Sequence, residues 1–183
     1  SPLFRAFAAD TGAFVIQREF SAQWERYYSP TIVDGIAYSN GGAYGGLIAF
    51  DAQAPFIHWE TALNQYDEWT PAVDDLFAYA YTGLYEPRLS IVERTSGIEA
   101  RSIPDPDFVW NGWSMQLAPV LGSANDLIVI QAQRLISFDL LLDTIRFQIE
   151  GALFQGQPSL ASGRIFALAS GALTVWDELT GDF

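Results

Sequence analysis

The stretch that decides the fold is PTIVDGIAYSNGGAYGGLIAFDAQAPFIHWE, residues 30–60. Its apolar runs are short and rich in β-branched and aromatic residues, a composition typical of β-strands. Turn signals separate the runs. Asp34-Gly35 is the strongest short-range signal for a hairpin, and glycines and a proline interrupt the chain between the later runs. The segment therefore predicts four short antiparallel strands.

The same unit recurs along the chain. Its copies open at Pro30, Pro71, Pro119 and Pro158, which are spaced 41, 48 and 39 residues apart. Each proline precedes a short strand, a polar two-residue turn and a second strand. These turns are Asp34-Gly35, Asp74-Asp75, Asn125-Asp126 and Ser162-Gly163. Four strands in about 40–45 residues is the period of a β-propeller blade. A β-sandwich also has short, evenly spaced strands, but it does not require such a repeat.

The second half of the unit also repeats. In each copy a strand ends at an acidic residue and a turn comes next, at Asp10, Asp51, Glu93, Asp139 and Asp177. A carboxylate or hydroxyl beside glycine suits a tight turn, because the side chain bonds nearby backbone amides while glycine takes positive φ. We therefore interpret these carboxylates as groups that fix turns and not as catalysts.

Composition excludes several functional classes. The chain has 183 residues, a net charge of −13, no Cys and no Lys, so all nine of its cations are Arg. Disulfides, thiolate chemistry and lysine Schiff bases are therefore absent from this chain. The negative charge repels phosphate backbones, so we expect no nucleic-acid partner. No apolar run approaches the ~20 residues that a membrane-spanning helix needs, and the first residues carry no visible signal peptide.

The spacing Ala-x-Asp-x-x-Thr-Gly-x-x-x-Trp connects the repeat to a known family. Ala49, Asp51 and Trp59 match it best, and later copies place Arg101 and Phe147 where Trp59 stands. This pattern resembles the pyrroloquinoline-quinone (PQQ)-type propeller repeat of quinoprotein alcohol dehydrogenases and of non-enzymatic relatives such as an outer-membrane assembly scaffold lipoprotein. The resemblance implies that the Trp position docks one blade against the next. Because its occupant varies here, we interpret the repeat as structurally degenerate, which favours a scaffold over an enzyme.

The expected architecture is an all-β propeller of four-stranded antiparallel blades. About four blades' worth is present, where the resemblance implies a ring of seven or eight. We expect partial blades at 1–29 and 158–183 around complete blades at 30–70, 71–118 and 119–157. Two readings stay open: the chain is part of a longer one, or two copies form a dimer that completes a ring.

Aromatic residues mark the candidate binding face. In a propeller the connections from each outer strand to the next inner strand lie on one face, so the aromatic residues of these connections are expected to cluster there. They are Trp24, Trp69, Phe108, Trp110 and Trp113. Aromatic faces suit a protein or a carbohydrate ligand. The alternative is that the residues of the 103–113 insertion cover the neighbouring blade.

Two other features could carry chemistry. Asp105 and Asp107 offer oxygen ligands for calcium, but they do not match an EF-hand loop and are also explained as a solvated loop. His58 is the only histidine and precedes Trp59, so strand alternation sends the two side chains to opposite faces. A lone histidine without Cys forms no recognisable metal set, and we expect it at the surface.

The sequence favours a non-enzymatic binding or scaffold module, in a bacterial-type extracytoplasmic compartment and without a cofactor. The alternatives are a fragment of a PQQ-dependent dehydrogenase and a carbohydrate-active propeller. For the dehydrogenase, the resemblance implies PQQ, Ca²⁺, an Asp base and, in many members, a vicinal disulfide. A chain without Cys cannot form that disulfide.

Overall fold

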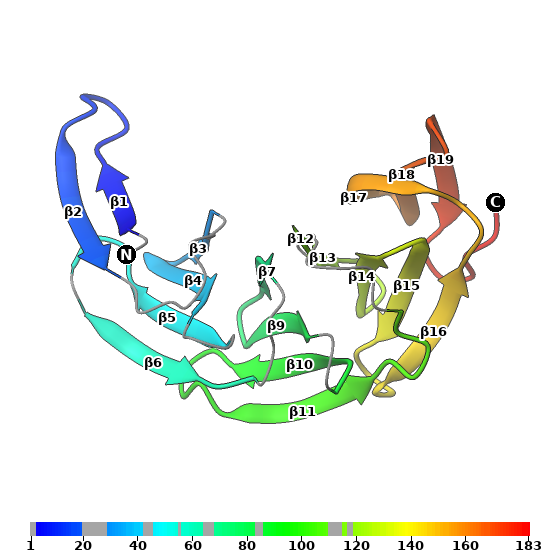
Figure 1. Cartoon of the computed structure of the whole chain (residues 1–183), viewed down its shortest axis with the longest axis horizontal. Coiled ribbons are helices and arrows are strands. Elements are labelled where there is room, and N and C mark those ends of the chain that lie inside the picture. Colours follow the sequence, from blue (N-terminus) through cyan, green and yellow to red (C-terminus); the bar gives the residue numbers. More distant parts are fainter. Residues whose placement is uncertain are drawn as a thin grey trace.

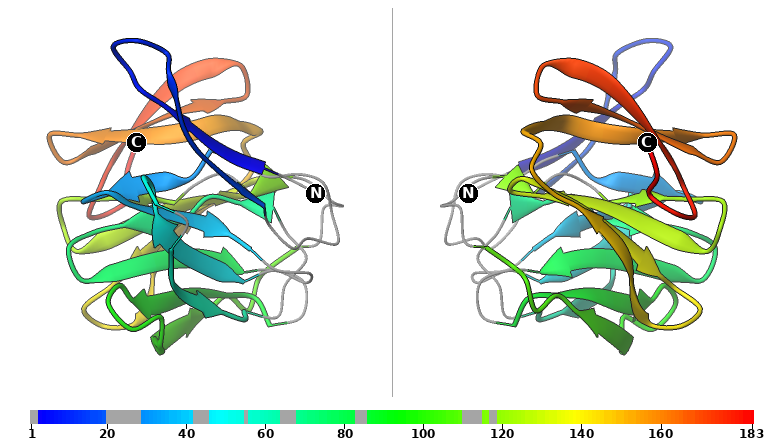
Figure 2. Two further views of the ribbon diagram at one scale, coloured as in Figure 1. Left: turned by 90° about the vertical axis from the view of Figure 1, so that its left-hand side faces the viewer. Right: turned by 90° about the vertical axis from the view of Figure 1, so that its right-hand side faces the viewer.

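The computed structural model describes residues 3–19, 29–41, 46–54, 56–63, 68–82, 86–109, 115–116 and 119–183, and these ranges contain strands but no helix. The strands form sheets that succeed one another along an open arc, with the two ends of the chain at opposite ends of the arc (Figure 1). The side views show the successive sheets layered one behind another (Figure 2). This arrangement confirms the all-β propeller fold with four-stranded antiparallel blades.

None of the residues that the structure describes belongs to a helix long and apolar enough to cross a membrane.

The first complete sheet matches the sequence prediction closely. Its order is β3-β4-β5-β6, all antiparallel. Its strands are β3 (Thr31–Val33), β4 (Ile36–Asn40), β5 (Leu47–Asp51) and β6 (Ile57–Thr61). Asp34 and Gly35 have φ values of 52° and 77°, the positive-φ pair that a tight two-residue hairpin requires. Aspartate tolerates this conformation and glycine adopts it without steric cost, so the turn is fixed locally.

Two further complete sheets repeat this antiparallel plan. The second consists of β8 (Ala72–Val73), β9 (Phe77–Thr82), β10 (Arg88–Glu93) and β11 (Glu99–Pro104). The third consists of β13 (Val120–Leu121), β14 (Asp126–Gln131), β15 (Arg134–Asp139) and β16 (Thr144–Ile149). In each complete sheet the last strand, β6, β11 or β16, runs along the convex side of the arc (Figure 1).

A smaller sheet stands at each end of the arc. The first pairs β1 (Leu3–Phe7) with β2 (Phe14–Glu19), and the last has the order β17-β18-β19. The strands of the last sheet are β17 (Phe154–Ala161), β18 (Arg164–Ala169) and β19 (Ala172–Asp177). β17 begins before Pro158, where the sequence placed the start of this unit. The proline sits in a register shift between Gln155 and Ser159, because a residue without an N–H is tolerated at a bulge.

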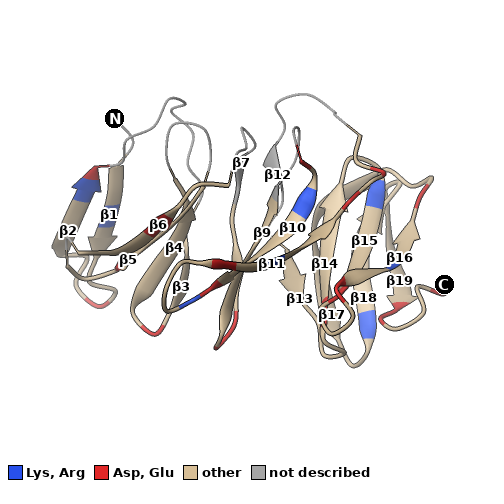
Figure 3. Ribbon diagram, turned by 90° about the horizontal axis from the view of Figure 1, so that it is seen from below, with Lys and Arg blue, Asp and Glu red and all other residues tan. Residues whose placement is uncertain are grey.

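The carboxylates at the third-strand turns do fix these turns. Oδ1 of Asp51, of Asp139 and of Asp177 each accepts the backbone N–H groups two and three residues further on, at 2.7–3.1 Å. At Glu93 the hydroxyl of Ser96 donates to the carboxylate instead. Acidic residues therefore concentrate at hairpin turns of the ribbon (Figure 3), as the turn interpretation predicted.

The hydrophobic core lies between the sheets and not within one layer. β14 shows the rule: Leu127 and Val129 join the cluster shared with the second sheet, while Ile128 and Ile130 join the cluster shared with the last sheet. Successive side chains of a strand point to opposite faces. A strand buried on both faces therefore reads as an unbroken apolar run, which is why 127–130 has no polar residue.

Candidate functional site

Two connections from outer to inner strands lie side by side, where short segments of each form a pair. β7 (Glu68–Trp69) and β12 (Met115–Gln116) are short segments that precede the second and third sheets. They pair in parallel, with Gln116 opposite Trp69. The backbone of Trp69 therefore lies beside the end of the insertion that comes after β11. We call this surface, formed by β7, β12 and residues 105–109, the connection face.

The structure describes only part of the predicted aromatic set. Trp24, Trp110 and Trp113 lie outside the described residues, and only the backbone of Trp69 is described. Phe108 is half-buried and packs against the core cluster between the second and third sheets. For Phe108 the structure favours the alternative in which the insertion covers the neighbouring blade. Val109, the next residue, is 57% exposed.

The base of the insertion is held by a buried ion pair. Arg134, at the start of β15, donates from Nη2 to Oδ2 of Asp105 at 2.6 Å and from Nη1 to Oδ1 at 3.0 Å. The hydroxyl of Tyr81 donates to the same carboxylate at 2.5 Å. Asp105 is only 2% exposed, and its bidentate contact with arginine is the geometry that best compensates a buried charge. Burial and the neighbouring carboxylate raise the pKa of Tyr81, which therefore stays a neutral donor.

Two glutamines extend this pair into a network. Gln131 accepts from Arg134 at 2.6 Å and donates to the carbonyl of Val109 at 2.6 Å. Gln148 accepts from Arg134 at 2.8 Å and donates to Asp107 at 2.8 Å. Residues 105–109 of one blade are thus bound at three points to the next blade. An open groove of about 480 Å³, lined mainly by residues of β10, β11 and the turn at 104–106, lies beside this base.

Sequence reasoning missed the three residues that hold the loop, namely Gln131, Arg134 and Gln148. A signal was present, because Arg134 stands after one apolar strand and begins another, so it required a buried partner. The partner itself could not be found from spacing, since Asp105 is 29 residues away.

The calcium prediction at Asp105 and Asp107 stays a prediction. Both oxygens of Asp105 already accept from Arg134, and Asp107 accepts from Gln148. Calcium binding there would require the guanidinium to leave its carboxylate. Across the described ranges, no three or more His, Asp or Glu side chains are grouped so as to hold a metal ion. His58 is exposed and Trp59 is buried, as strand alternation predicted.

At the seams between blades, the position held by Trp59, Arg101 or Phe147 contacts the next blade. Trp59 donates from Nε1 to the carbonyl of Arg94 at 2.9 Å. Its ring also packs against Gly97, so closely that a Cβ added to this glycine would lie 2.6 Å from the nearest ring atom. Phe147 packs against Gly181 in the same way, and a Cβ added to Gly181 would lie 2.7 Å from the phenyl ring.

At the seam between them, Arg101 forms an ion pair with Asp143 at 2.9 Å. Like Gly97 and Gly181, Asp143 lies four residues after the acidic turn residue of its own blade. Two seams therefore have an aromatic–glycine contact, and the seam between them has an ion pair at the same position.

Radial four-stranded sheets joined by these docking contacts form a β-propeller, the fold that the PQQ-type resemblance implied. The chain is similar to BamB from Moraxella catarrhalis, with a TM-score of 0.72 and 16% identity over 99% of this chain and 54% of that one. It is also similar to a europium-containing methanol dehydrogenase, with a TM-score of 0.68 and 10% identity over 98% of this chain and 46% of that one. The computationally designed Ika4 protein matches with a TM-score of 0.64 and 14% identity, over 83% and 91% of the two chains.

The chain thus spans about half the length of BamB and of the methanol dehydrogenase. At these identities the likeness confirms the PQQ-like fold and nothing finer. No family model matches the chain, and no curated protein matches it in sequence.

Proposed function

We propose that this chain is a binding module of the PQQ-like propeller type, without catalytic activity, whose partner protein docks on the connection face. The observation that carries this function is the attachment of residues 105–109 to the next blade by the network around Arg134. These contacts hold residues 105–109 in a defined place, which lowers the entropic cost of binding a partner through them.

Two further observations favour a binding role. Val109 is exposed and comes directly after the half-buried Phe108, so its side chain is accessible to a partner on the connection face. The docking positions of the blades also vary between an aromatic–glycine contact and an ion pair. We infer an extracytoplasmic, bacterial-type location from the family resemblance alone.

A site-specific crosslinking experiment tests this function. A photoreactive residue is placed at Val109 on the connection face, and in a control chain at Leu76, in the β8–β9 turn on the opposite face. Both side chains are exposed, at 57% and 68%. In cells that make the protein, we expect a discrete protein adduct from position 109 and none from position 76. Equal adduct patterns from the two positions would contradict a specific connection-face partner.

A second assay separates binding from the enzymatic alternatives. The purified chain is mixed with PQQ, Ca²⁺, an alcohol and a dye acceptor, and dye reduction is monitored. A binding module leaves the dye oxidised, whereas turnover would establish a quinoprotein dehydrogenase. Tryptophan fluorescence on addition of polysaccharides tests the carbohydrate alternative, because a sugar stacked on the aromatic face changes the emission.

A further inference from the structure

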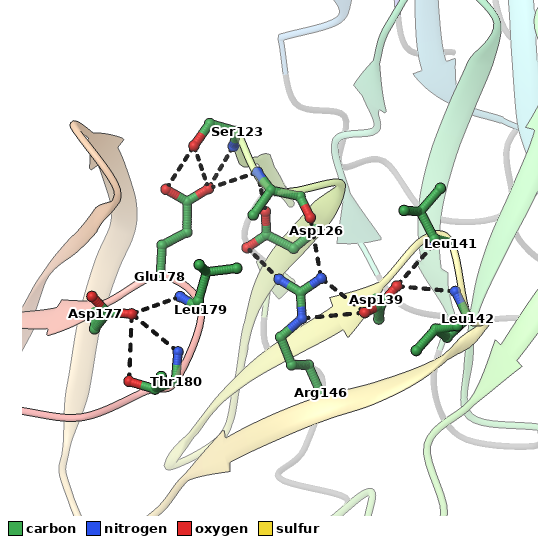
Figure 4. A network of polar contacts seen from close by, with 11 residues as sticks. Ser123, Asp126, Asp139, Leu141, Leu142, Arg146, Asp177, Glu178, Leu179 and Thr180 are labelled. Atoms are coloured by element: carbon green, nitrogen blue, oxygen red, sulfur yellow. Dashed lines mark hydrogen bonds and ion pairs between the residues drawn. The ribbon is translucent and has the colours of Figure 1, made fainter.

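A second buried polar cluster lies at the seam between the third sheet and the last one (Figure 4). Glu178 comes directly after β19, and its carboxylate reaches the β13–β14 turn of the preceding sheet. Its Oε1 accepts the backbone N–H groups of Ser123 and Ala124, at 2.5 and 3.2 Å, and the hydroxyl of Ser123 donates to both of its oxygens. One carboxylate thus ties the last sheet to the third sheet.

A second carboxylate shares this site. Asp126, the first residue of β14, is 0% exposed and Glu178 is 1% exposed. Oδ1 of Asp126 accepts the same N–H of Ala124 that Glu178 accepts, again at 3.2 Å. A Cβ on Gly122 would lie 2.2 Å from that Oδ1 and 2.6 Å from Oε1 of Glu178. One oxygen of each carboxylate therefore lies close to the α-carbon of Gly122, and any larger residue at this position would clash with both oxygens.

The nearby cation does not neutralise both acids. Nη2 of Arg146 on β16 donates to Asp139 at 2.8 Å, while its Nη1 stands 4.0 Å from Oδ2 of Asp126. Among the described residues, neither that Nη1 nor that Oδ2 has a hydrogen-bond partner. The guanidinium is thus committed mainly to Asp139, and it neutralises neither carboxylate of the pair.

The other elements around the site do not supply the missing cation. Asp177, at the end of β19, is bound by Arg164 of β18 at 3.1 Å and by the amides of its own turn. β17 packs against β13 and β14 and carries no charged residue. Two buried carboxylates in contact cannot both ionise without a large cost, so such a pair holds one proton in common.

We propose that the Asp126–Glu178 pair is a pH-sensitive latch between the third and last sheets, closed when the two carboxylates share a proton and loosened when that proton is lost. Burial, then the charge of Glu178 and a hydrogen bond to it, raises the pKa of Asp126 from 3.8 to about 6. The folded site therefore holds a proton that the opened site releases. The contact is fully formed below about pH 4 and weakens as the pH rises through about 6.

Hydrogen exchange of the seam tests the latch directly. The amides of Ser123 and Ala124 donate to Glu178, so their protection reports whether the seam is closed. After correction for the intrinsic pH dependence of exchange, opening of the wild-type seam should become about tenfold more frequent between pH 5 and pH 7.5. In parallel, the carboxyl carbon signal of Asp126 should titrate in ¹³C NMR with a midpoint near 6, a measurement that needs no variant.

Two variants separate a proton-linked contact from a merely structural one. Asp126→Asn places an amide where the shared proton would be and should abolish the tenfold change, leaving the seam as closed at pH 7.5 as at pH 5. Glu178→Gln removes the other charge and should also abolish the change. Asp177→Asn, beside the pair but bound by its own turn, is the control and should keep it. The latch is refuted if the wild-type Asp126 signal titrates near pH 4, or if Asp126→Asn retains the wild-type pH dependence.

Discussion

Replacing Gly97 by Ala tests the docking of one blade on the next. Gly97 has a φ of 73°, and a Cβ at this position would lie 2.6–2.8 Å from three ring atoms of Trp59. Trp59 is buried and donates its indole N–H to the carbonyl of Arg94. The added methyl group must displace the ring or separate the turn from it, because a non-bonded contact this short is not tolerated.

Gly35→Ala is the matched control. Gly35 has nearly the same φ, 77°, and nothing lies within 4 Å of its Cβ position. Both substitutions carry the cost of a left-handed alanine, about 1–2 kcal/mol. Only Gly97→Ala adds overpacking, about 1–3 kcal/mol, and a weakened indole hydrogen bond, about 1 kcal/mol. We expect it to lower the free energy of unfolding by about 2–4 kcal/mol more than the control does.

The assay is thermal and urea unfolding of the wild-type chain and both variants, monitored by circular dichroism and tryptophan fluorescence. For a chain of this size, the difference between the variants corresponds to about 4–16 °C in Tm. The fluorescence of folded Gly97→Ala should also shift to longer wavelength as the indole becomes more exposed. If both variants lose the same stability and keep the wild-type emission, Trp59 does not dock on Gly97 and the account of the seams is wrong.

The ion pairs give three further predictions, each checked by urea unfolding. Asp105→Ala leaves Arg134 buried without its carboxylate and should lower the free energy of unfolding by about 3–5 kcal/mol. A loss below about 1 kcal/mol, as for an exposed ion pair, would show that the pair does not hold the loop. Arg101→Ala breaks the partly exposed ion pair with Asp143. It should lower the free energy of unfolding by at most about 1 kcal/mol at low salt and hardly at all in about 1 M NaCl. An equal loss at both salt concentrations would contradict an ionic contact. The pKa of Asp139 is lowered by its arginine partner and by its turn amides, so its contribution to stability is present above about pH 4 and is lost as the pH falls further. Asp139→Asn should therefore be less stable than wild type at about pH 7, and the gap should narrow as the pH falls below about 4. A gap independent of pH would refute this linkage.

Much of the fold was predictable because the rules that set it are local. Four antiparallel strands form in the segment around Asp34-Gly35, as the sequence predicted, since positive φ and alternation act over a few residues. The turn carboxylates were predictable for the same reason: Asp51 bonds amides two and three positions away. The start of the last sheet was not, because a proline marks either the first residue of a strand or a bulge within it.

The candidate site was predicted only in outline. The sequence indicated that the connections share a face, and the pairing of β7 with β12 agrees with this. Phe108 could be read in two ways, and its packing against the core depends on the shape of the neighbouring blade. Arg134 and Glu178, the charged residues that join neighbouring sheets, were not singled out from the sequence, because neither lies near its partner along the chain.

By itself, the sequence determined the strands and the turns, because each depends on contacts within about ten residues. It also showed the period of the repeat, and its resemblance to the PQQ-type repeat indicated the class of propeller. Only the tertiary structure decided which side chains meet across the seams: Trp59 with Gly97, Arg101 with Asp143, Asp105 with Arg134 and Asp126 with Glu178. These pairs join residues 29–52 positions apart. The stacking of whole sheets brings them together, and burial then makes their charge and shape decisive.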